Sequence, residues 1–283
     1  GGRRMIRSDR MWRLFALPAL AVWLTLAAGF VRAVDETTGA PEAGVSSGLP
    51  VSPAPTDGTG ARDGELRIAA LGDSLTTGVG DDGGKGYVGR VRERLEAETG
   101  RKAVVVNFSI PGLTTEGLLA QLGQQAHIGR TVAEADVVLL TIGGNDLFGI
   151  ARDVFDPGRD TFDLDRVEAR IPAAIANFAA VMDKLAGWNS RAPIVYIAPY
   201  NPFYDVDEGA KAARGVALWN ARAMEVVAGK RNGVFIGTAD LFQVQFSARI
   251  ARDHFHPNER GYEAIAERVV QALAEQEAVR DGG

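Results

Sequence analysis

Ser74 lies where a buried strand is expected to end, and a serine in that position can act as a nucleophile. An apolar run covers residues 66–71, and Gly72 and Asp73 interrupt it just before the serine. In an open α/β sheet, ligands bind beyond the carboxyl ends of the strands. A serine there needs two companions before it can attack a carbonyl carbon, namely a base and donors that stabilise an oxyanion.

Near the C-terminus, Asp253 and His256 are the residue types that form such a base. They are three residues apart, a spacing that lets both side chains reach one side of a single turn. An imidazole accepts a hydroxyl proton when a carboxylate holds its other ring nitrogen, so we expect Asp253 to orient His256 toward Ser74. A metal site that includes His254 is the alternative. The chain has only three histidines and no cysteine, so we expect no metal.

Two loops nearer the middle of the chain offer hydrogen-bond donors. Gly112 follows an apolar run at residues 103–108, and Asn145 follows another at residues 136–142. A glycine lets the backbone N–H approach a ligand closely, and an asparagine amide donates from its side chain. Because the carboxyl ends of adjacent parallel strands meet at one edge of a sheet, both donors can converge with Ser74.

The elements that must position these residues alternate between strands and helices from residue 65 onward. Apolar runs typical of buried strands cover residues 66–71, 103–108, 136–142, 193–198 and 234–237. An apolar stripe at helical spacing runs from Leu164 to Leu185, and Asp165 with Glu168 resembles a capping box at its start. Two further helices are expected at about residues 208–229 and 259–277. We therefore predict a three-layer α/β/α sandwich with a central, mostly parallel five-stranded sheet.

The N-terminal part of the chain has the pattern of an export segment. Residues 14–31 contain no charge and follow an arginine-rich start, and Val31-Arg32-Ala33 offers a small-residue cleavage site. Since 18 apolar residues also reach the lower limit of a membrane span, residues 1–33 are either a signal peptide or an N-terminal membrane anchor. Residues 34–64 are rich in Gly, Pro and Ser and indicate a flexible spacer. We expect an exported protein, in the cell envelope or outside the cell, whose residues 65–283 form the catalytic domain.

Charge and composition exclude several functions. The net charge is −5 although the first 33 residues are strongly basic, so the rest of the chain is acidic, which argues against a nucleic-acid partner. Residues Gly78 to Gly83 match G-x-G-x-x-G, but the run begins well beyond the strand end and contains two aspartates, which would repel a pyrophosphate. We expect a monomer that acts on a small molecule without a cofactor.

The order of the motifs resembles the SGNH (GDSL) hydrolase superfamily. The matching residues are Gly72-Asp73-Ser74-Leu75, Asn107 with Gly112, Gly143 with Asn145 and Asp146, and Asp253 with His256 and Pro257. The resemblance covers residues 66–277 and implies Ser74 as nucleophile, His256 as base and Asp253 as its partner. It also implies an oxyanion hole formed by the N–H groups of Ser74 and Gly112 and by the Asn145 side chain. The first motif further resembles exported bacterial lipases and esterases.

Residues beside these motifs are candidate contacts for the substrate. We assign that role to Asp73, Leu147, Phe148, Tyr200 and Asn201. The last two belong to an aromatic segment that either lines the pocket or only packs a loop. Apolar residues next to Asn145 favour a lipid or other acyl ester, as in a lysophospholipase-like enzyme. Two alternatives are a carbohydrate O-acetyl esterase acting on envelope or plant polysaccharide and a noncatalytic cell-envelope binding protein. The intact set of Ser74, Asp253 and His256 argues against the binding protein.

Overall fold

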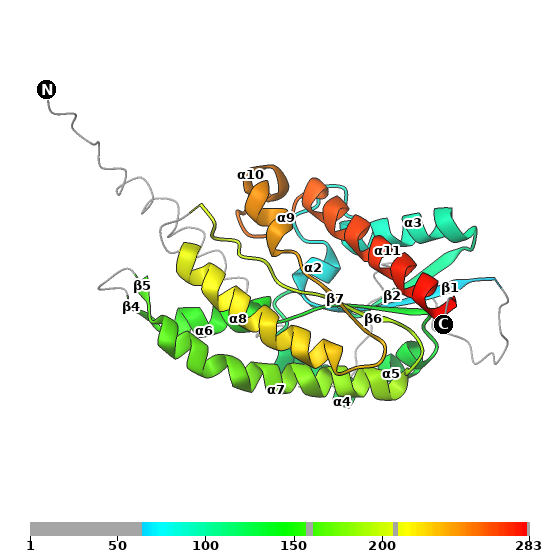
Figure 1. Ribbon diagram of the computed structural model, residues 1–283, viewed down its shortest axis with the longest axis horizontal. Coiled ribbons are helices and arrows are strands. Elements are labelled where there is room, and N and C mark those ends of the chain that lie inside the picture. The colour runs from blue at the N-terminus through cyan, green and yellow to red at the C-terminus, as the bar shows by residue number, and fades with distance from the viewer. Residues whose placement is uncertain (1–63, 157–160, 206–208, 282–283) are drawn as a thin grey trace, which may run out of the picture. The chain divides into compact units, whose positions relative to one another are not determined.

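A parallel sheet of five strands forms the centre of the part of the chain that the computed structural model describes, residues 64–156, 161–205 and 209–281. Its strands are β1 (Leu66–Gly72), β2 (Ala103–Asn107), β3 (Val137–Thr141), β6 (Ile194–Ile197) and β7 (Gly233–Ile236), in the order β2-β1-β3-β6-β7 (Figure 1). A separate short hairpin pairs β4 (Phe155–Asp156) with β5 (Thr161–Phe162). Each predicted strand of the central sheet is within one residue of the observed one at both ends.

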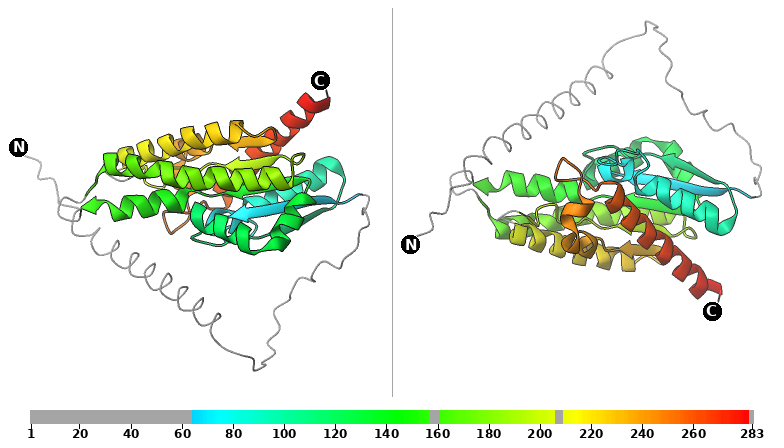
Figure 2. Two further views of the ribbon diagram at one scale, coloured as in Figure 1. Left: turned by 90° about the horizontal axis from the view of Figure 1, so that it is seen from below. Right: turned by 90° about the horizontal axis from the view of Figure 1, so that it is seen from above.

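Helices cover both faces of this sheet, which confirms the predicted α/β/α sandwich. One face carries α3 (Gly86–Thr99), α9 (Ala239–Val244) and α11 (Glu259–Asp281), and the other carries α4 (Thr115–Gln124), α5 (Ala126–Ala133), α7 (Leu164–Trp188) and α8 (Gly209–Ala228) (Figure 2). Successive strand residues point to opposite faces, so Ile68 packs on the α3 side and Ala69 on the α7 side. Three short helices complete the described elements, α2 (Ser74–Thr77), α6 (Gly144–Asp153) and α10 (Phe246–Arg249).

The start of α7 differs from the prediction. Its N-cap is Asp163, whose backbone is extended and whose carboxylate accepts a hydrogen bond from the N–H of Arg166 at 3.2 Å. Asp165 lies inside the first turn, so the predicted capping box is wrong. Glu168 instead forms an ion pair with Arg214 of α8 at 2.8 Å, which links the two helices.

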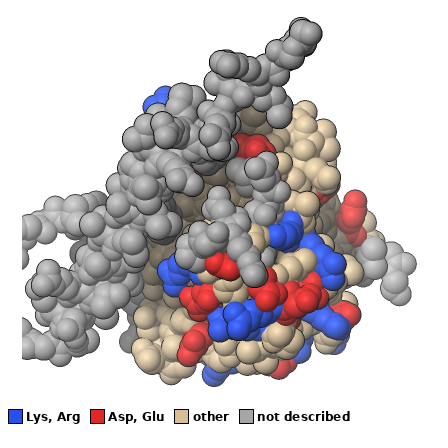
Figure 3. All heavy atoms as spheres, turned by 90° about the vertical axis from the view of Figure 1, so that its left-hand side faces the viewer, with Lys and Arg blue, Asp and Glu red and all other residues tan. Residues whose placement is uncertain are grey.

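Charged side chains of both signs are mixed on the described surface. In the face shown in Figure 3, lysine and arginine side chains lie among aspartate and glutamate side chains. Within the described residues, none of the helices has the length and apolar character needed to cross a membrane. The predicted export segment, residues 1–33, and nearly all of the predicted spacer lie outside the described residues.

Candidate active site

The carboxyl end of β1 places Ser74 at the first position of helix α2. Gly72 has φ +130°, and a Cβ atom there would lie 1.9 Å from the carbonyl oxygen of Thr141 on the neighbouring strand. Only glycine fits this close approach. Asp73 is the N-cap of α2, and its carboxylate accepts a hydrogen bond from the N–H of Leu75 at 3.1 Å. The close approach at Gly72 and the cap at Asp73 thus fix the backbone turn that presents Ser74.

Asp253, His256 and Ser74 form a continuous chain of hydrogen bonds. The Nε2 atom of His256 lies 2.8 Å from Ser74 Oγ, and Nδ1 lies 2.6 Å from an oxygen of Asp253. His256 is 1% exposed, so water does not compete for either ring nitrogen. With Nδ1 donating to Asp253, Nε2 is left to accept the proton of Ser74.

The surroundings of Asp253 favour its charged form. Burial alone would raise the pKa of this carboxyl group, but the hydrogen bonds from the His256 ring and from the N–H groups of His256 and Phe255 outweigh burial and lower the pKa to about 2. Asp253 is therefore ionised at neutral pH. A negative charge at this place stabilises the imidazolium that forms when His256 accepts a proton.

His254 does not belong to this chain of hydrogen bonds. It is exposed, and its φ of +56° puts it in the left-handed region, inside the tight turn that brings Asp253 and His256 together. Among the described residues, no group of three His, Asp or Glu side chains is arranged to hold a metal ion.

A hydrogen bond connects the two loops that are expected to supply oxyanion donors. Asn145 lies at the second position of α6, and one N–H of its amide donates to the carbonyl oxygen of Leu113 at 2.9 Å. The amide has a second N–H that a substrate can use. Gly112, the residue before Leu113, has φ +81°, a left-handed conformation that favours glycine. Asn145 therefore positions the Gly112 loop in addition to offering a donor.

Asp146 forms a second link between the same two loops, a role the sequence reasoning did not assign. Its carboxylate accepts hydrogen bonds from the hydroxyl of Thr115 at 2.6 Å and from the N–H of Thr115 at 3.0 Å. Thr115 begins α4 and is fully buried. Asp146 next to Asn145 was visible in the sequence, but its partner lies 31 positions earlier, on a different loop.

A network of buried hydroxyl groups holds the carboxylate of Asp73 next to the serine. The hydroxyl of Thr141 donates to Asp73 Oδ1 at 2.7 Å and contacts the hydroxyl of Thr76 at 2.7 Å, and Thr76 contacts the hydroxyl of Tyr87 at 2.8 Å. Burial raises the pKa of Asp73, and the bonds from Thr141 and Leu75 offset this only in part. These contacts give Asp73 a structural role even though it lines the cavity described next.

A cavity of about 120 Å³ opens beside Ser74, and most of the residues that line it are apolar. All five candidate substrate contacts, Asp73, Leu147, Phe148, Tyr200 and Asn201, are among them. The polar atoms of the last two are already in use. The Tyr200 hydroxyl donates to the carbonyl oxygen of Phe255 at 2.5 Å, and the Asn201 amide bonds to Gly209 and Phe203. The segment after β6 therefore both lines the cavity and packs its own loop.

Comparison with known proteins identifies the family of this chain. A model of the GDSL-like lipase/acylhydrolase family matches residues 70–264. The uncharacterized protein YpmR of Bacillus subtilis is 36% identical over 215 residues, which cover 73% of this chain and 80% of YpmR. The chain belongs to the GDSL-like lipase/acylhydrolase family. It is thus an ester hydrolase of the SGNH type, as the order of its motifs predicted.

Solved structures show the same fold for this hydrolase. The lipase Lip_vut3 from a goat rumen metagenome matches with a TM-score of 0.64 and 26% identity over 73% of this chain and 97% of the lipase. A catalytic mutant of Axe2, an acetylxylan esterase from Geobacillus stearothermophilus, matches with a TM-score of 0.55 over 74% of this chain and 94% of Axe2. At 21% identity, the likeness to Axe2 shows the fold alone.

The loop between α2 and α3 packs against the segment that carries His256. A Cβ atom on Gly80, which has φ +94°, would lie 2.9 Å from the Cβ atom of His256 and 2.5 Å from the carbonyl oxygen of Pro257. The hydroxyl of Tyr262 in α11 donates to the carbonyl oxygen of Val79 at 2.6 Å. The loop and the segment that carries His256 are therefore in direct contact.

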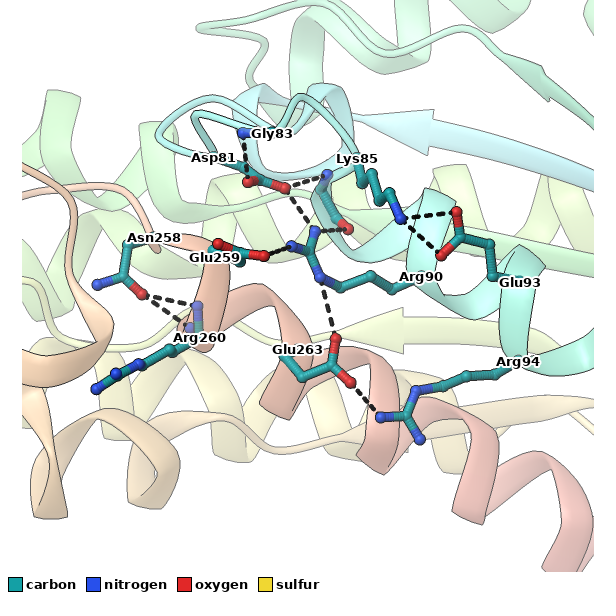
Figure 4. Close-up of polar contacts among 12 residues, drawn as sticks. Asp81, Gly83, Lys85, Arg90, Glu93, Arg94, Asn258, Glu259, Arg260 and Glu263 are labelled. Atoms are coloured by element: carbon teal, nitrogen blue, oxygen red, sulfur yellow. Dashed lines mark hydrogen bonds and ion pairs between the residues drawn. The ribbon is translucent and has the colours of Figure 1, made fainter.

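Arg90 of α3 ties this loop to α11 (Figure 4). Its guanidinium group, only 6% exposed, contacts the fully buried carboxylate of Asp81 at 2.5 Å. It also contacts Glu263 at 3.1 Å and Glu259 at 3.5 Å, both in α11. Asp81 further accepts hydrogen bonds from one N–H group of its own loop and from the first N–H group of α3. Asp81 of the G-x-G-x-x-G run thus forms a buried ion pair with Arg90 that anchors the loop to α3.

Proposed function

We propose that this hydrolase is an exported serine enzyme that cleaves acyl esters, with Ser74 as nucleophile, His256 as general base and Asp253 as the partner of the histidine. One observation carries the proposal. Ser74 Oγ lies 2.8 Å from His256 Nε2 at the edge of a cavity with a mostly apolar lining. A hydroxyl in hydrogen-bond contact with an oriented imidazole is the arrangement that activates a serine.

The reaction proceeds through an acyl-enzyme. Ser74 Oγ attacks the carbonyl carbon of the ester while its proton passes to His256 Nε2. His256 then gives this proton to the oxygen of the departing alcohol, and the acyl group stays on Ser74. A water molecule, deprotonated by His256, attacks the acyl carbon and releases the carboxylic acid, which regenerates the serine. Asp253 remains charged throughout and stabilises the imidazolium.

The oxyanion of the tetrahedral intermediate is assigned to three donors. These are the N–H groups of Ser74 and Gly112 and the amide of Asn145, which can use the N–H that does not bond to Leu113. The bonds that Asn145 and Asp146 make to the Gly112 loop hold the donors in place before substrate arrives. Preorganised donors of this kind stabilise charge that develops only in the transition state.

The cavity favours an apolar acyl ester over a sugar acetate. Its lining residues include Leu147, Phe148, Val216 and Phe255, whose side chains gain from contact with hydrocarbon and offer few partners for sugar hydroxyls. The similarity to the lipase Lip_vut3 supports the same choice. A lipid or other fatty acyl ester is therefore the proposed substrate class.

The experiment compares the parent with Ser74→Ala and Ser109→Ala, using a fluorophosphonate probe and a chromogenic short-chain ester. Ser109 is a matched control because its hydroxyl lies in a neighbouring loop, bonded to Asn107 and Thr77. Ser74→Ala should abolish labelling and lower kcat/KM by roughly 10⁴-fold or more, because the residues of a triad act as a unit. Ser109→Ala should retain both the labelling by the probe and the kcat/KM of the parent. An intact, folded parent that neither reacts with the probe nor turns over esters would favour the noncatalytic binding protein.

The substrate class and the location each have their own test. A preference for acetylated glycans over fatty acyl esters in a substrate screen would favour the O-acetyl esterase. Export rests on the uncharged residues 14–31 after an arginine-rich start, which also provide a route to membrane association. Mass spectrometry of the N-terminus after expression in a bacterium should find either release after Ala33 or retention in the membrane fraction. A full-length product in the cytoplasm would contradict export.

A further inference from the structure

We infer that the part of the cavity between α6 and α8 receives the acyl chain of the ester, and that Gly215 sets how long a chain it accepts. The inference rests on the proposed function, because it requires Ser74 to attack an ester whose acyl group then enters this space. It names a specificity-determining residue and a substrate class, esters of medium-length fatty acids.

Gly215 is the observation that points to this role. It is buried in the middle of α8, where glycine is less favourable than alanine because it loses more backbone freedom on folding. A Cβ atom built on Gly215 would meet only Val167 Cγ1, at 3.8 Å, which is an ordinary contact. Neither close packing nor a left-handed backbone therefore requires glycine here. The missing side chain enlarges the cavity that Gly215 lines.

Two alanines also line this space, one on α8 and one on α6. Ala212 lines the cavity near Gly215 on α8, and Ala151 lines it from α6, one helical turn beyond Leu147. Val167 of α7 lies beside Gly215 and completes the apolar wall. Apart from Lys211 of α8, the three helices thus line this space with hydrocarbon side chains and with alanine or glycine where a chain would pass.

The position of His256 indicates which part of the ester enters. His256 must give its proton to the alcohol oxygen, so the alcohol has to leave on the side of the histidine. Of the turn that carries His256, residues 253–257, only Phe255 lines the cavity, whereas Gly144, Asn145 and Leu147 line it from α6, on the oxyanion side. The group that extends into the cavity is therefore the acyl chain.

The volume sets a rough scale for the chain. A cavity of about 120 Å³ has room for on the order of eight water-sized groups at roughly 15 Å³ each. An acetyl group would leave most of this space empty. A chain of roughly six to ten carbons fills it and buries its methylenes against apolar walls.

The experiment measures kcat/KM for a series of 4-nitrophenyl esters from acetate to dodecanoate. It compares the full-length parent with Gly215→Ala, Gly215→Leu and Ala151→Leu. Gly187→Leu is the matched control, because Gly187 is also a helical glycine but lies in α7 with open space around its would-be Cβ and outside the cavity lining. Thermal melting of each variant checks the fold, and Gly215→Ala should be at least as stable as the parent.

The parent should prefer chains of about six to ten carbons. Gly215→Leu should lower kcat/KM for octanoate by roughly 15- to 60-fold relative to acetate, because two or three methylenes lose their burial. Gly215→Ala should give a smaller shift in the same direction. Ala151→Leu narrows the cavity from the opposite wall and should give a shift comparable to that of Gly215→Leu. Gly187→Leu should give no shift. If Gly215→Leu does not fold, Gly215→Ala and Ala151→Leu decide.

Three results would overturn the inference. One is an equal loss on acetate and octanoate in the Gly215 and Ala151 variants, which would indicate only structural damage. Another is a chain-length profile that these variants leave unchanged. The third is a shift seen when the alcohol is lengthened in a series of alkyl acetates and not when the acyl chain is lengthened. A parent that hydrolyses no ester would overturn the proposed function and the inference with it.

Discussion

Replacing Arg90 by methionine should destabilise the hydrolase far more than a surface charge change does. The substitution keeps much of the side-chain length but leaves the carboxylate of Asp81, whose side chain is 0% exposed, without its counterion. Removing one partner of a buried ion pair costs about 3–5 kcal/mol, because the remaining charge stays desolvated. For a domain of this size, about 2–4 °C is lost per kcal/mol, so the melting temperature should fall by roughly 6–20 °C.

Arg94→Met is the matched control on the same helix. Arg94 is 37% exposed and pairs with Glu263, which is itself 46% exposed, so water screens the pair. Its loss should cost less than about 1 kcal/mol. The assay is urea unfolding of both variants and the parent at neutral pH, followed by circular dichroism. Equal losses of unfolding free energy for Arg90→Met and Arg94→Met would refute the reasoning.

The same comparison has a pH dependence with a definite sign. Burial raises the pKa of Asp81, but the hydrogen bonds from Arg90, Gly86 and Gly83 outweigh it, and the net pKa is lower than usual. A lowered pKa in the folded state adds stability above the unfolded value of about 3.9, and this stability is lost as the pH falls through the folded value. The advantage of the parent over Arg90→Met should therefore shrink as the pH falls, because protonation of Asp81 relieves the variant of its unpaired charge before it affects the parent. An advantage that grows on acidification would contradict this account.

Three further predictions concern the active site itself. Asn145→Ala should lower kcat by about 10²–10³-fold with little change in KM, and a variant that only raises KM would place the oxyanion donor elsewhere. Asp146→Ala should lower the free energy of unfolding, measured in urea, by about 1–3 kcal/mol, because it removes two hydrogen bonds to the buried Thr115. It should lower kcat as well. Loss of activity in His256→Ala should far exceed that in His254→Ala, and equal losses restored by added zinc would instead favour a metal site.

The strands and the contact between Asp253 and His256 were predictable because their signals are local. Each strand of the sheet is a short apolar run bounded by polar or glycine residues, so its ends could be placed within one residue. Asp253 and His256 lie three residues apart in one turn, so their contact follows from the backbone alone. The cap of α7 was missed for a local reason too. Asp163 and Asp165 flank Leu164 at the start of the apolar stripe, and only the extended backbone at Asp163 decides between them.

The helical walls of the cavity could not be predicted, because they come from distant parts of the chain. Ala151, Val167 and Gly215 lie on three helices, and each fits an ordinary helical pattern in the sequence. Only their packing shows that the small side chains face a common space. Asp81 was missed for a similar reason. In the sequence its charge argues against a phosphate site, whereas in the structure Arg90 of the next helix balances that charge inside the protein.

Three aspartates belong to the motifs of the candidate site, and their surroundings give them different roles. Burial raises the pKa of Asp73 and of Asp146, and a threonine hydroxyl holds each of them, so these two carboxyl groups fix loops. Asp253 is half-exposed, and its hydrogen bonds lower its pKa to about 2. Of the three, only Asp253 contacts the imidazole, and it is also the one whose pKa the environment lowers. We therefore expect a fall in activity between pH 7 and pH 4 to have a source other than protonation of Asp253.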